Sequence, residues 1–246
     1  MNWVVYDVDG VLIDVSESFD RVVKKSVEYL SNDFEGEISK QKVRNLREKE
    51  IFGDDFKLTE VFVIGLEIFG SPEGVIQNFI KGANIEWVRR NWGGNVDKVK
   101  LKKVFNTFYL GEKYEERLFD CEGLWKEERS IVKDELLRKI DKRYKTGVIT
   151  GRDKLELNIA EKIISYEFNN SITRNDYLKP DPKALKELVG IDKGIFIGDN
   201  LSDQLLVDNY VSKYSGNFDF IKIGKDYDDV NSFLEELLDN KMLSFS

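Results

Sequence analysis

Residues 3–11 read Trp-Val-Val-Tyr-Asp-Val-Asp-Gly-Val, an apolar run that ends in two aspartates. Residues 3–6 are apolar without alternation, which is typical of a strand buried on both faces of a parallel sheet. Asp7 and Asp9 follow directly, so they stand at the carboxyl end of this strand, where open α/β sheets bind their ligands. This stretch therefore predicts the first strand of a parallel sheet and two candidate site residues.

Beyond about residue 120 the chain alternates short apolar runs with amphipathic segments. Strands are expected at 147–149, 194–197 and 220–223, with helices at about 128–140, from Asp153, from about Ser202 and close to the C-terminus. This alternation predicts an α/β fold with a doubly wound, mainly parallel, Rossmann-like sheet.

Residues 16–119 follow a different pattern, with helical periods and few strand signals. Glycines separate the expected helices, which cover about 19–30, 38–51, 57–69, 73–92 and 96–110. We therefore expect two domains. Residues 1–15 and 120–246 form the Rossmann-like core, and residues 16–119 form a helical insertion after its first strand.

Composition excludes several classes of function. Lys and Arg number 38 against 46 Asp and Glu, and the net charge of −8 argues against a broad contact with nucleic acid or an anionic membrane. The apolar stretch 61–66 is far shorter than the ~20 residues of a membrane span. Cys121 is the single cysteine, which excludes an intrachain disulfide and favours a cytoplasmic location.

The sequence contains no histidine. Proton transfer near neutral pH then falls to carboxylates, lysine, tyrosine, cysteine or metal-bound water. Zinc sites that need imidazole ligands are excluded as well.

Three further segments place polar residues after or beside expected strands. They are Thr150-Gly151-Arg152, Lys179-Pro180-Asp181-Pro182 and Gly198-Asp199-Asn200-Leu201-Ser202-Asp203. Because ligands of open α/β sheets lie beyond the carboxyl ends of the strands, we expect these segments to meet Asp7 and Asp9 in one crevice.

Three aspartates in this crevice form a candidate metal site. Asp7 and Asp9 lie roughly 6.6 Å apart along an extended strand, on the same side of it, and Asp199 joins them from a neighbouring strand end. Two unit charges 4 Å apart repel by about 4 kcal/mol at an effective dielectric constant of 20, so the cluster either raises a pKa or holds a cation. Oxygen ligands without histidine favour Mg²⁺.

Each of these residues also has a structural interpretation. Asp-x-Asp-Gly begins calcium loops, but Leu12 and Ser18 occupy the positions that such a loop gives to glycine and glutamate. Thr150 alone is compatible with a helix cap, and Lys179 alone with an exposed lysine. Arg152 is compatible with a substrate contact and equally with a structural ion pair. The order of the motifs along the chain carries more information than any one residue.

That order resembles the four motifs of the haloacid dehalogenase (HAD) superfamily of phosphotransferases. The matching residues are Asp7-Val8-Asp9-Gly10-Val11, Thr150, Lys179 with Pro180, and Gly198-Asp199 to Asp203. The helical insertion resembles the cap of the phosphoglycolate-phosphatase-like branch, although residues 16–119 exceed the usual length of that helical cap.

The resemblance implies a role for each matching residue. Asp7 would be the nucleophile that forms an aspartyl-phosphate. Asp9 would be the acid/base that protonates the leaving group and then activates water. Thr150 would hydrogen-bond the transferring phosphoryl group, and Lys179 would position that group and offset the charge around Asp7.

The resemblance also implies the binding residues. Mg²⁺ would be bound by Asp7, Asp199 and the backbone carbonyl of Asp9, with Asp203 behind these ligands. The residues expected to bind the phosphate or the substrate are Gly10, Thr150, Gly151, Arg152 and Lys179.

We therefore expect a Mg²⁺-dependent HAD-type phosphatase that hydrolyses a small phosphorylated metabolite and binds neither nucleic acid nor membrane. Loss of a halide needs no acid, so Asp9 favours a phosphatase over a dehalogenase. Two alternatives stay open. One is a phosphotransferase or phosphomutase of the same superfamily, and the other is a non-catalytic metal- and ligand-binding protein on this fold. The pattern leaves the substrate and the oligomeric state open.

Overall fold

The computed structural model describes residues 2–31, 34, 36–49 and 54–239. The chain divides into two compact units. Met1–Val15 and Glu128–Ser246 form the first, which we call the α/β unit, and Ser16–Glu127 form the second, which we call the helical unit. In the described part of the chain, no helix has the length and apolar character that crossing a bilayer requires.

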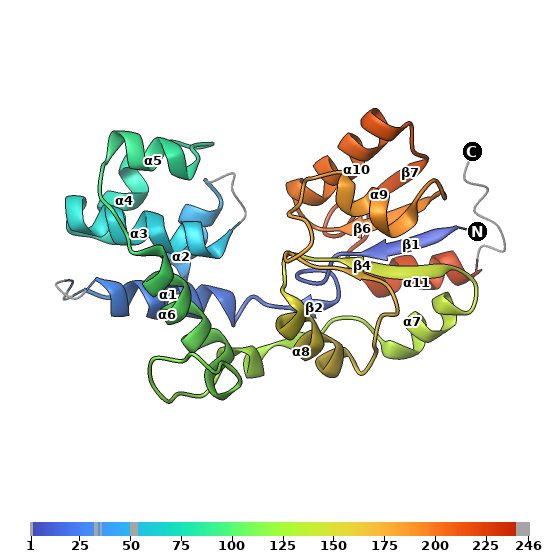
Figure 1. Ribbon diagram of the computed structural model, residues 1–246, viewed down its shortest axis with the longest axis horizontal. Coiled ribbons are helices and arrows are strands. Elements are labelled where there is room, and N and C mark those ends of the chain that lie inside the picture. The colour runs from blue at the N-terminus through green and yellow to red at the C-terminus, as the bar shows by residue number, and fades with distance from the viewer. Residues whose placement is uncertain (1, 32–33, 35, 50–53, 240–246) are drawn as a thin grey trace. The chain divides into compact units, whose positions relative to one another are not determined.

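The α/β unit is built on a parallel five-stranded sheet with strand order β5-β4-β1-β6-β7 (Figure 1). Its strands are β1 (Trp3–Tyr6), β4 (Lys145–Ile149), β5 (Ser171–Ile172), β6 (Gly194–Gly198) and β7 (Phe218–Lys222). Tyr6 pairs with Val148 of β4 and with Ile197 of β6. The register therefore brings the carboxyl ends of these three strands to one edge of the sheet.

Helices cover both faces of this sheet, which confirms the doubly wound α/β class. Val4 and Tyr6 of β1 pack on one face with α7 (Asp134–Asp141), α8 (Lys154–Ile164) and α11 (Val230–Asp239). Trp3 and Val5 pack on the other face with α9 (Lys183–Val189) and α10 (Leu201–Tyr214). Because successive side chains of a strand point to opposite faces, an unbroken apolar run is what such a central strand needs.

The helical unit contains six α-helices within its described residues. They are α1 (Phe19–Leu30), α2 (Lys40–Arg47), α3 (Asp55–Phe69), α4 (Pro72–Asn78), α5 (Ile85–Asn91) and α6 (Lys98–Leu110). Side chains cap five of their N-termini; Asp97, for example, accepts hydrogen bonds from the amides of Val99 and Lys100. The unit extends to Glu127 because η2 (Leu124–Glu127) contacts α6 and α1.

Three helices differ from the sequence-based expectation. The helix expected over 73–92 is two helices, α4 and α5, because Phe79 is extended and Gly82 takes a positive φ between them. The helix expected from 128 begins only at Asp134, since β3 (Arg129–Ser130) pairs with β2 (Ile13–Asp14). In place of the helix expected over 38–51, the structure has α2 over Lys40–Arg47. Residues 50 and 51 of the expected range lie outside the described residues.

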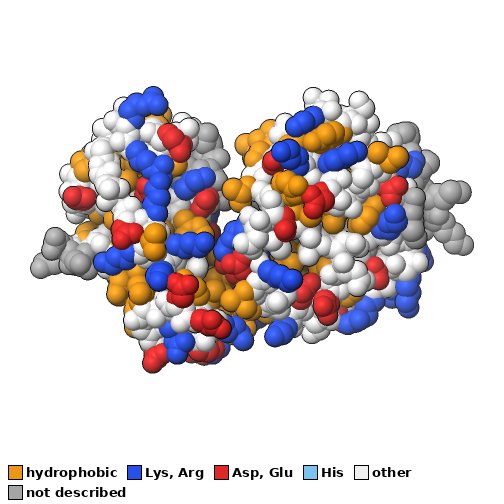
Figure 2. Space-filling model, in the orientation of Figure 1, with side chains coloured by type: hydrophobic (Ala, Val, Ile, Leu, Met, Phe, Trp, Pro, Cys, Tyr) orange, Lys and Arg blue, Asp and Glu red, His pale blue; other side chains and the backbone are white. Residues whose placement is uncertain are grey.

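Charged side chains of both signs are interspersed over the face shown in Figure 2. No broad basic surface appears on that face.

Candidate active site

Asp7 lies at the carboxyl end of β1, with its residue only 3% exposed. Its amide donates to the carbonyl oxygen of Ile197, 2.8 Å away, so the hydrogen bonding between β1 and β6 continues into the site. Its Oδ1 accepts from the amide of Val8 at 2.7 Å and lies 2.8 Å from Nζ of Lys179. The carboxylate of Asp7 is therefore held in one orientation by its own strand end and by a buried cation.

Lys179 reaches this carboxylate from the loop between β5 and α9. Its Nζ also donates to Oδ1 of Asp203 at 2.6 Å, and its side chain is nearly buried. Burial acts to lower the pKa of Lys179, but the adjacent carboxylates of Asp7 and Asp203 outweigh it and raise the pKa above its ordinary value. The ammonium group therefore stays charged at any physiological pH.

Asp7, Asp199 and Asp203 form an acidic cluster in which one carboxylate oxygen of each lies within 4.8 Å of the others. Burial, followed by the charge of Asp203, raises the pKa of Asp7 well above its ordinary value, although Lys179 opposes this shift. The same two causes raise the pKa of Asp199 to about 6. Three carboxylates with one ammonium between them leave an excess of negative charge that a divalent cation would offset.

Asp203 owes its place in this cluster to the start of α10. Its amide donates to Oδ1 of Asn200, while its own Oδ2 accepts from the amides of Asp199 and Asn200. This reciprocal arrangement is a capping box. Both oxygens of Asp203 therefore already accept hydrogen bonds, one of them from Lys179.

Gly10 comes very close to Asp199. Its φ is +76°, and a Cβ atom at this position would lie 2.0 Å from Oδ2 of Asp199. Glycine is therefore required here both for the backbone conformation and for the space that the carboxylate occupies.

The loop after β4 contributes Thr150, Gly151 and Arg152. Thr150 is buried, its amide donates to the carbonyl of Ile172, and its Oγ1 accepts from the amide of Arg152 at 3.1 Å. Gly151 is exposed, and a Cβ atom at its position would meet no described atom within 4 Å. Since β4 is the neighbour of β1, this loop starts at the same edge of the sheet as Asp7.

Asp9 turns toward this loop. Oδ1 of Asp9 lies 2.8 Å from Nε and 2.6 Å from Nη2 of Arg152. Nη2 also donates to Oε2 of Glu128 at 2.8 Å. Asp9 and Arg152, which the sequence pattern assigns to the site for different reasons, are thus direct partners, whereas the acidic cluster is formed without the side chain of Asp9.

Sequence reasoning misses Glu128, whose side chain is fully buried beside Arg152. The pattern predicts the start of an amphipathic helix there, where an acidic residue is ordinarily exposed. No local signal marks Glu128, because its partner is far away in the sequence.

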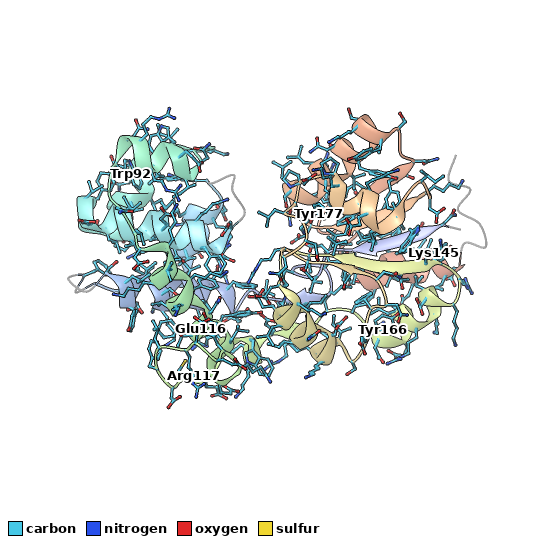
Figure 3. The ribbon with its side chains drawn as sticks, in the orientation of Figure 1. Trp92, Glu116, Arg117, Lys145, Tyr166 and Tyr177 are labelled. Atoms are coloured by element: carbon cyan, nitrogen blue, oxygen red, sulfur yellow. The ribbon has the colours of Figure 1, made fainter. Side chains whose placement is uncertain are left out.

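The opposite edge of the sheet carries a different set of charges. Lys145, labelled in Figure 3, begins β4 and pairs with Asp192, to which the indole of Trp3 also donates. Because ligands of open parallel sheets bind beyond the carboxyl ends, we assign the candidate site to the edge with Asp7.

Comparison with known proteins places the chain in a family. No protein-family model matches the sequence, and no curated protein matches it. Among solved structures, phosphatase Tt82 from Thermococcus thioreducens is 50% identical, with 97% of this chain and 99% of that chain covered and a TM-score of 0.86.

Two more distant structures share the fold. A HAD-superfamily hydrolase from Geobacter sulfurreducens is 15% identical, with 96% of each chain covered and a TM-score of 0.50. A predicted phosphoglycolate phosphatase from Haemophilus somnus is 13% identical, with 94% of this chain and 88% of that chain covered and a TM-score of 0.56.

The fold and the likeness to Tt82 define the class of this protein as a hydrolase of α/β fold, with a parallel sheet and an acidic cluster at the carboxyl ends of its strands. The chain belongs to the haloacid dehalogenase superfamily, and it is a phosphatase of that superfamily. The resemblance seen in the order of its motifs is thereby confirmed.

Proposed function

We propose that this phosphatase is Mg²⁺-dependent and hydrolyses a small phosphorylated metabolite through an aspartyl-phosphate on Asp7. The observation that carries the proposal is the ammonium of Lys179, 2.8 Å from the carboxylate of Asp7, at the margin of the acidic cluster. A buried carboxylate with a fixed cation beside it is oriented for attack, and the cation offsets the charge of an approaching phosphate.

In the first step an oxygen of Asp7 attacks the phosphorus atom, and the bond between phosphorus and the ester oxygen breaks. Asp9, in its protonated form, gives its proton to that oxygen, which leaves as an alcohol. Thr150 and Lys179 donate hydrogen bonds to the oxygens of the transferring group. Gly151 leaves room for that group close to the backbone, and its exposure and the open space around it support this role. Gly10 contributes indirectly, because the carboxylate of Asp199 occupies the space that a side chain there would fill.

In the second step a water molecule attacks the phosphorus atom of the aspartyl-phosphate. Asp9, now a carboxylate, takes a proton from this water. The bond between phosphorus and Asp7 breaks, which releases inorganic phosphate and restores the carboxylate of Asp7. The proton given away in the first step is thus regained in the second.

The residues present fit a magnesium ion. All three members of the acidic cluster are carboxylates, the donors that Mg²⁺ prefers, and a divalent cation would offset the repulsion that helps to raise the pKa of Asp7 and Asp199. We assign Asp7, Asp199 and the backbone carbonyl of Asp9 as ligands. Asp203 orients them, because its oxygens already accept from Lys179 and from the amides of the α10 start. A bound Mg²⁺ would supply Lewis-acid stabilisation of the phosphoryl oxygens.

The reaction needs all of these contributions together. Hydrolysis of phosphate monoesters is so slow without a catalyst that enzymes accelerate it by up to ~10²¹-fold. One positioned acid or base contributes roughly 10²–10⁴-fold. A nucleophile, fixed positive charge and an acid/base must therefore act in one site.

We further propose that residues 16–119 act as the cap that the resemblance implies and select the substrate. Closure of a cap excludes water and completes the substrate contacts. The division of the chain into an α/β unit and a separate compact helical unit supports this role.

Release of inorganic phosphate from a panel of phosphorylated metabolites, with Mg²⁺ or with EDTA, tests the proposal. We expect turnover that EDTA abolishes and added Mg²⁺ restores, and that Asp7→Asn abolishes. Asp208→Asn, which makes the same change on the exposed side of α10, serves as the control and is expected to keep full activity. Activity that survives both EDTA and Asp7→Asn would refute the mechanism.

A further inference from the structure

Arg152 is the largest fully buried side chain of the chain's described residues, with 1% exposed. Its guanidinium makes contacts on every side. Nε and Nη2 meet Oδ1 of Asp9 at 2.8 and 2.6 Å, Nη2 meets Oε2 of Glu128 at 2.8 Å, and Nη1 donates to the carbonyl oxygen of Glu156 at 3.3 Å. The orientation of this group is therefore set by three different segments of the α/β unit.

Stability alone does not explain why Arg152 contacts two carboxylates, Glu128 and Asp9. Arg152 and Glu128, both buried, already balance each other in charge. Burying such a pair gains little over apolar side chains of similar volume, because the desolvation of both ions must be overcome. Asp9 is the third member of this group, and its side chain is 28% exposed. The buried Arg152–Glu128 pair is therefore in contact with a carboxylate that solvent and ligands can reach.

The two oxygens of Asp9 differ in their surroundings. Oδ1 accepts a hydrogen bond from Nε of Arg152 and lies 2.6 Å from its Nη2. Oδ2 receives no hydrogen bond from any group in residues 2–31, 34, 36–49 and 54–239. An arginine bound to one oxygen restricts rotation of the carboxyl group and leaves the other oxygen to exchange a proton.

We propose that Arg152, held by Glu128, is a positioning residue that aims Oδ2 of Asp9 at the ester oxygen of the substrate. This inference rests on the proposed function, in which Asp9 is the acid/base. Arg152 then acts through Asp9 and does not bind the phosphate itself. Glu128 orients the guanidinium and offsets its charge, so that the pair directs Asp9 without adding net positive charge beside it.

The test uses the double variant Arg152→Met/Glu128→Gln, which removes both buried charges together and so avoids leaving one of them unpaired. Its matched control is Arg89→Met/Glu60→Gln. This pair makes the same chemical change in the helical unit, where Arg89 binds a nearly buried Glu60 through two hydrogen bonds of 2.8 Å. Circular dichroism and thermal unfolding establish that both variants fold.

The measurement is kcat/KM with Mg²⁺ for a series of phosphate monoesters whose leaving groups range from p-nitrophenol to a simple alcohol. The parameter kcat/KM covers the steps from free enzyme and substrate up to the departure of the alcohol, which is the step that Asp9 assists. A poor leaving group needs a correctly placed acid, whereas nitrophenolate does not. We expect the Arg152→Met/Glu128→Gln variant to lose about 10–100-fold on the alkyl ester and less than about threefold on the nitrophenyl ester.

Two further variants complete the test. Arg152→Lys keeps the charge but lacks the planar fork that contacts two carboxylates at once, so we expect a loss on alkyl esters that is smaller but has the same dependence on the leaving group. In an Asp9→Asn background, Arg152→Met/Glu128→Gln should cause no additional dependence on the leaving group, because the group that it positions is already inactive.

The inference would be overturned if the Arg152→Met/Glu128→Gln variant lost activity equally on all esters or lost none on any of them. It would also be overturned if the Arg89→Met/Glu60→Gln control showed the same change in the dependence of kcat/KM on the leaving group. The Asp7→Asn variant separates these outcomes from failure of the proposed function. If Asp7→Asn is inactive and the leaving-group dependence is unchanged, the positioning role alone is wrong. If Asp7→Asn stays active, the mechanism itself is wrong.

Discussion

Nζ of Lys179 lies 2.8 Å from Oδ1 of Asp7. These residues come from the loop before α9 and the end of β1, and the same ammonium group also binds Asp203. The lysine thus keeps two buried carboxylates close together and offsets their mutual repulsion. This contact therefore stabilises the acidic cluster through a fixed positive charge beside two of its carboxylates.

Replacement of this ammonium tests its importance directly. Lys179→Met leaves Asp7 and Asp203 without their common counter-charge, and we expect kcat to fall by about 10²–10³-fold. Loss of one partner of a buried ion pair should also lower the free energy of unfolding by about 3 kcal/mol. Steady-state kinetics and urea unfolding measure the two effects. Lys183→Met, an exposed lysine at the start of α9, is the control, and equal losses in both variants would contradict the role of Lys179.

Gly10→Ala is expected to weaken magnesium binding. Its Cβ atom would lie 2.0 Å from Oδ2 of Asp199, so the carboxylate must move. We expect the Mg²⁺ concentration for half-maximal activity to rise by at least about tenfold, as follows when a metal ligand is displaced. Gly224→Ala is a close control, since Gly224 has a φ of +80° and no described atom within 4 Å of its Cβ position.

Both glycine variants should lose about 1 kcal/mol of stability through the positive φ. Only Gly10→Ala should change the magnesium dependence. If both variants reached half-maximal activity at a similar Mg²⁺ concentration, the close approach of Gly10 to Asp199 would not matter for magnesium binding.

Asp20 tests the stability of the helical unit. Its buried carboxylate accepts from Arg44 Nε at 2.6 Å and from Arg47 Nη2 at 3.1 Å. Because both arginines are about one-third or more exposed, we expect Asp20→Ala to cost about 2 kcal/mol, the range of hydrogen bonds to charged groups, and not the full penalty of a buried charge. Chemical unfolding measures this cost. Glu37→Ala, which removes an exposed partner of Lys24, should leave the free energy of unfolding almost unchanged.

Cys121 is expected to react slowly with thiol reagents. Burial, the largest cause, raises the pKa of this thiol, and its Sγ donates to the carbonyl of Thr107 at 3.2 Å. A raised pKa leaves less thiolate at a given pH, so alkylation at pH 8 should be slower than for free cysteine, whose pKa is about 8.5, and should reach its half-maximal rate at higher pH. Alkylation rates from pH 7 to 10 check this.

The Cys121→Ser variant should keep full phosphatase activity, since no step of the proposed mechanism uses the thiol. Reaction at pH 7 as fast as free cysteine would contradict the assignment of Cys121 as an unreactive group.

Much of the α/β unit is predictable because its signals are local. The apolar run of residues 3–6 indicates a central strand, and the polar residues after three strands indicate the edge at which a site lies. The helical unit is harder. The break between α4 and α5 depends on Gly82, one of several glycines in that region, and the pattern offers no reason to choose it.

The candidate site shows the same division. Asp7 and Asp199 are expected from the sequence to lie close together, and they do. Asp203, expected behind the other ligands, has an oxygen within the cluster itself, because the capping box of α10 turns its carboxylate toward Lys179. The pattern leaves two interpretations of Arg152 open, and its side chain pairs with Asp9 and Glu128.

By itself, the sequence determined which backbone segments meet, because strand periodicity and the parallel connections bring the carboxyl ends of β1, β4 and β6 to one edge. Tertiary structure alone decided which side chains pair there. The partners of Arg152 and the burial of Glu128 depend on distances between residues remote in the chain, and electrostatic interactions follow those distances and the local exposure to water.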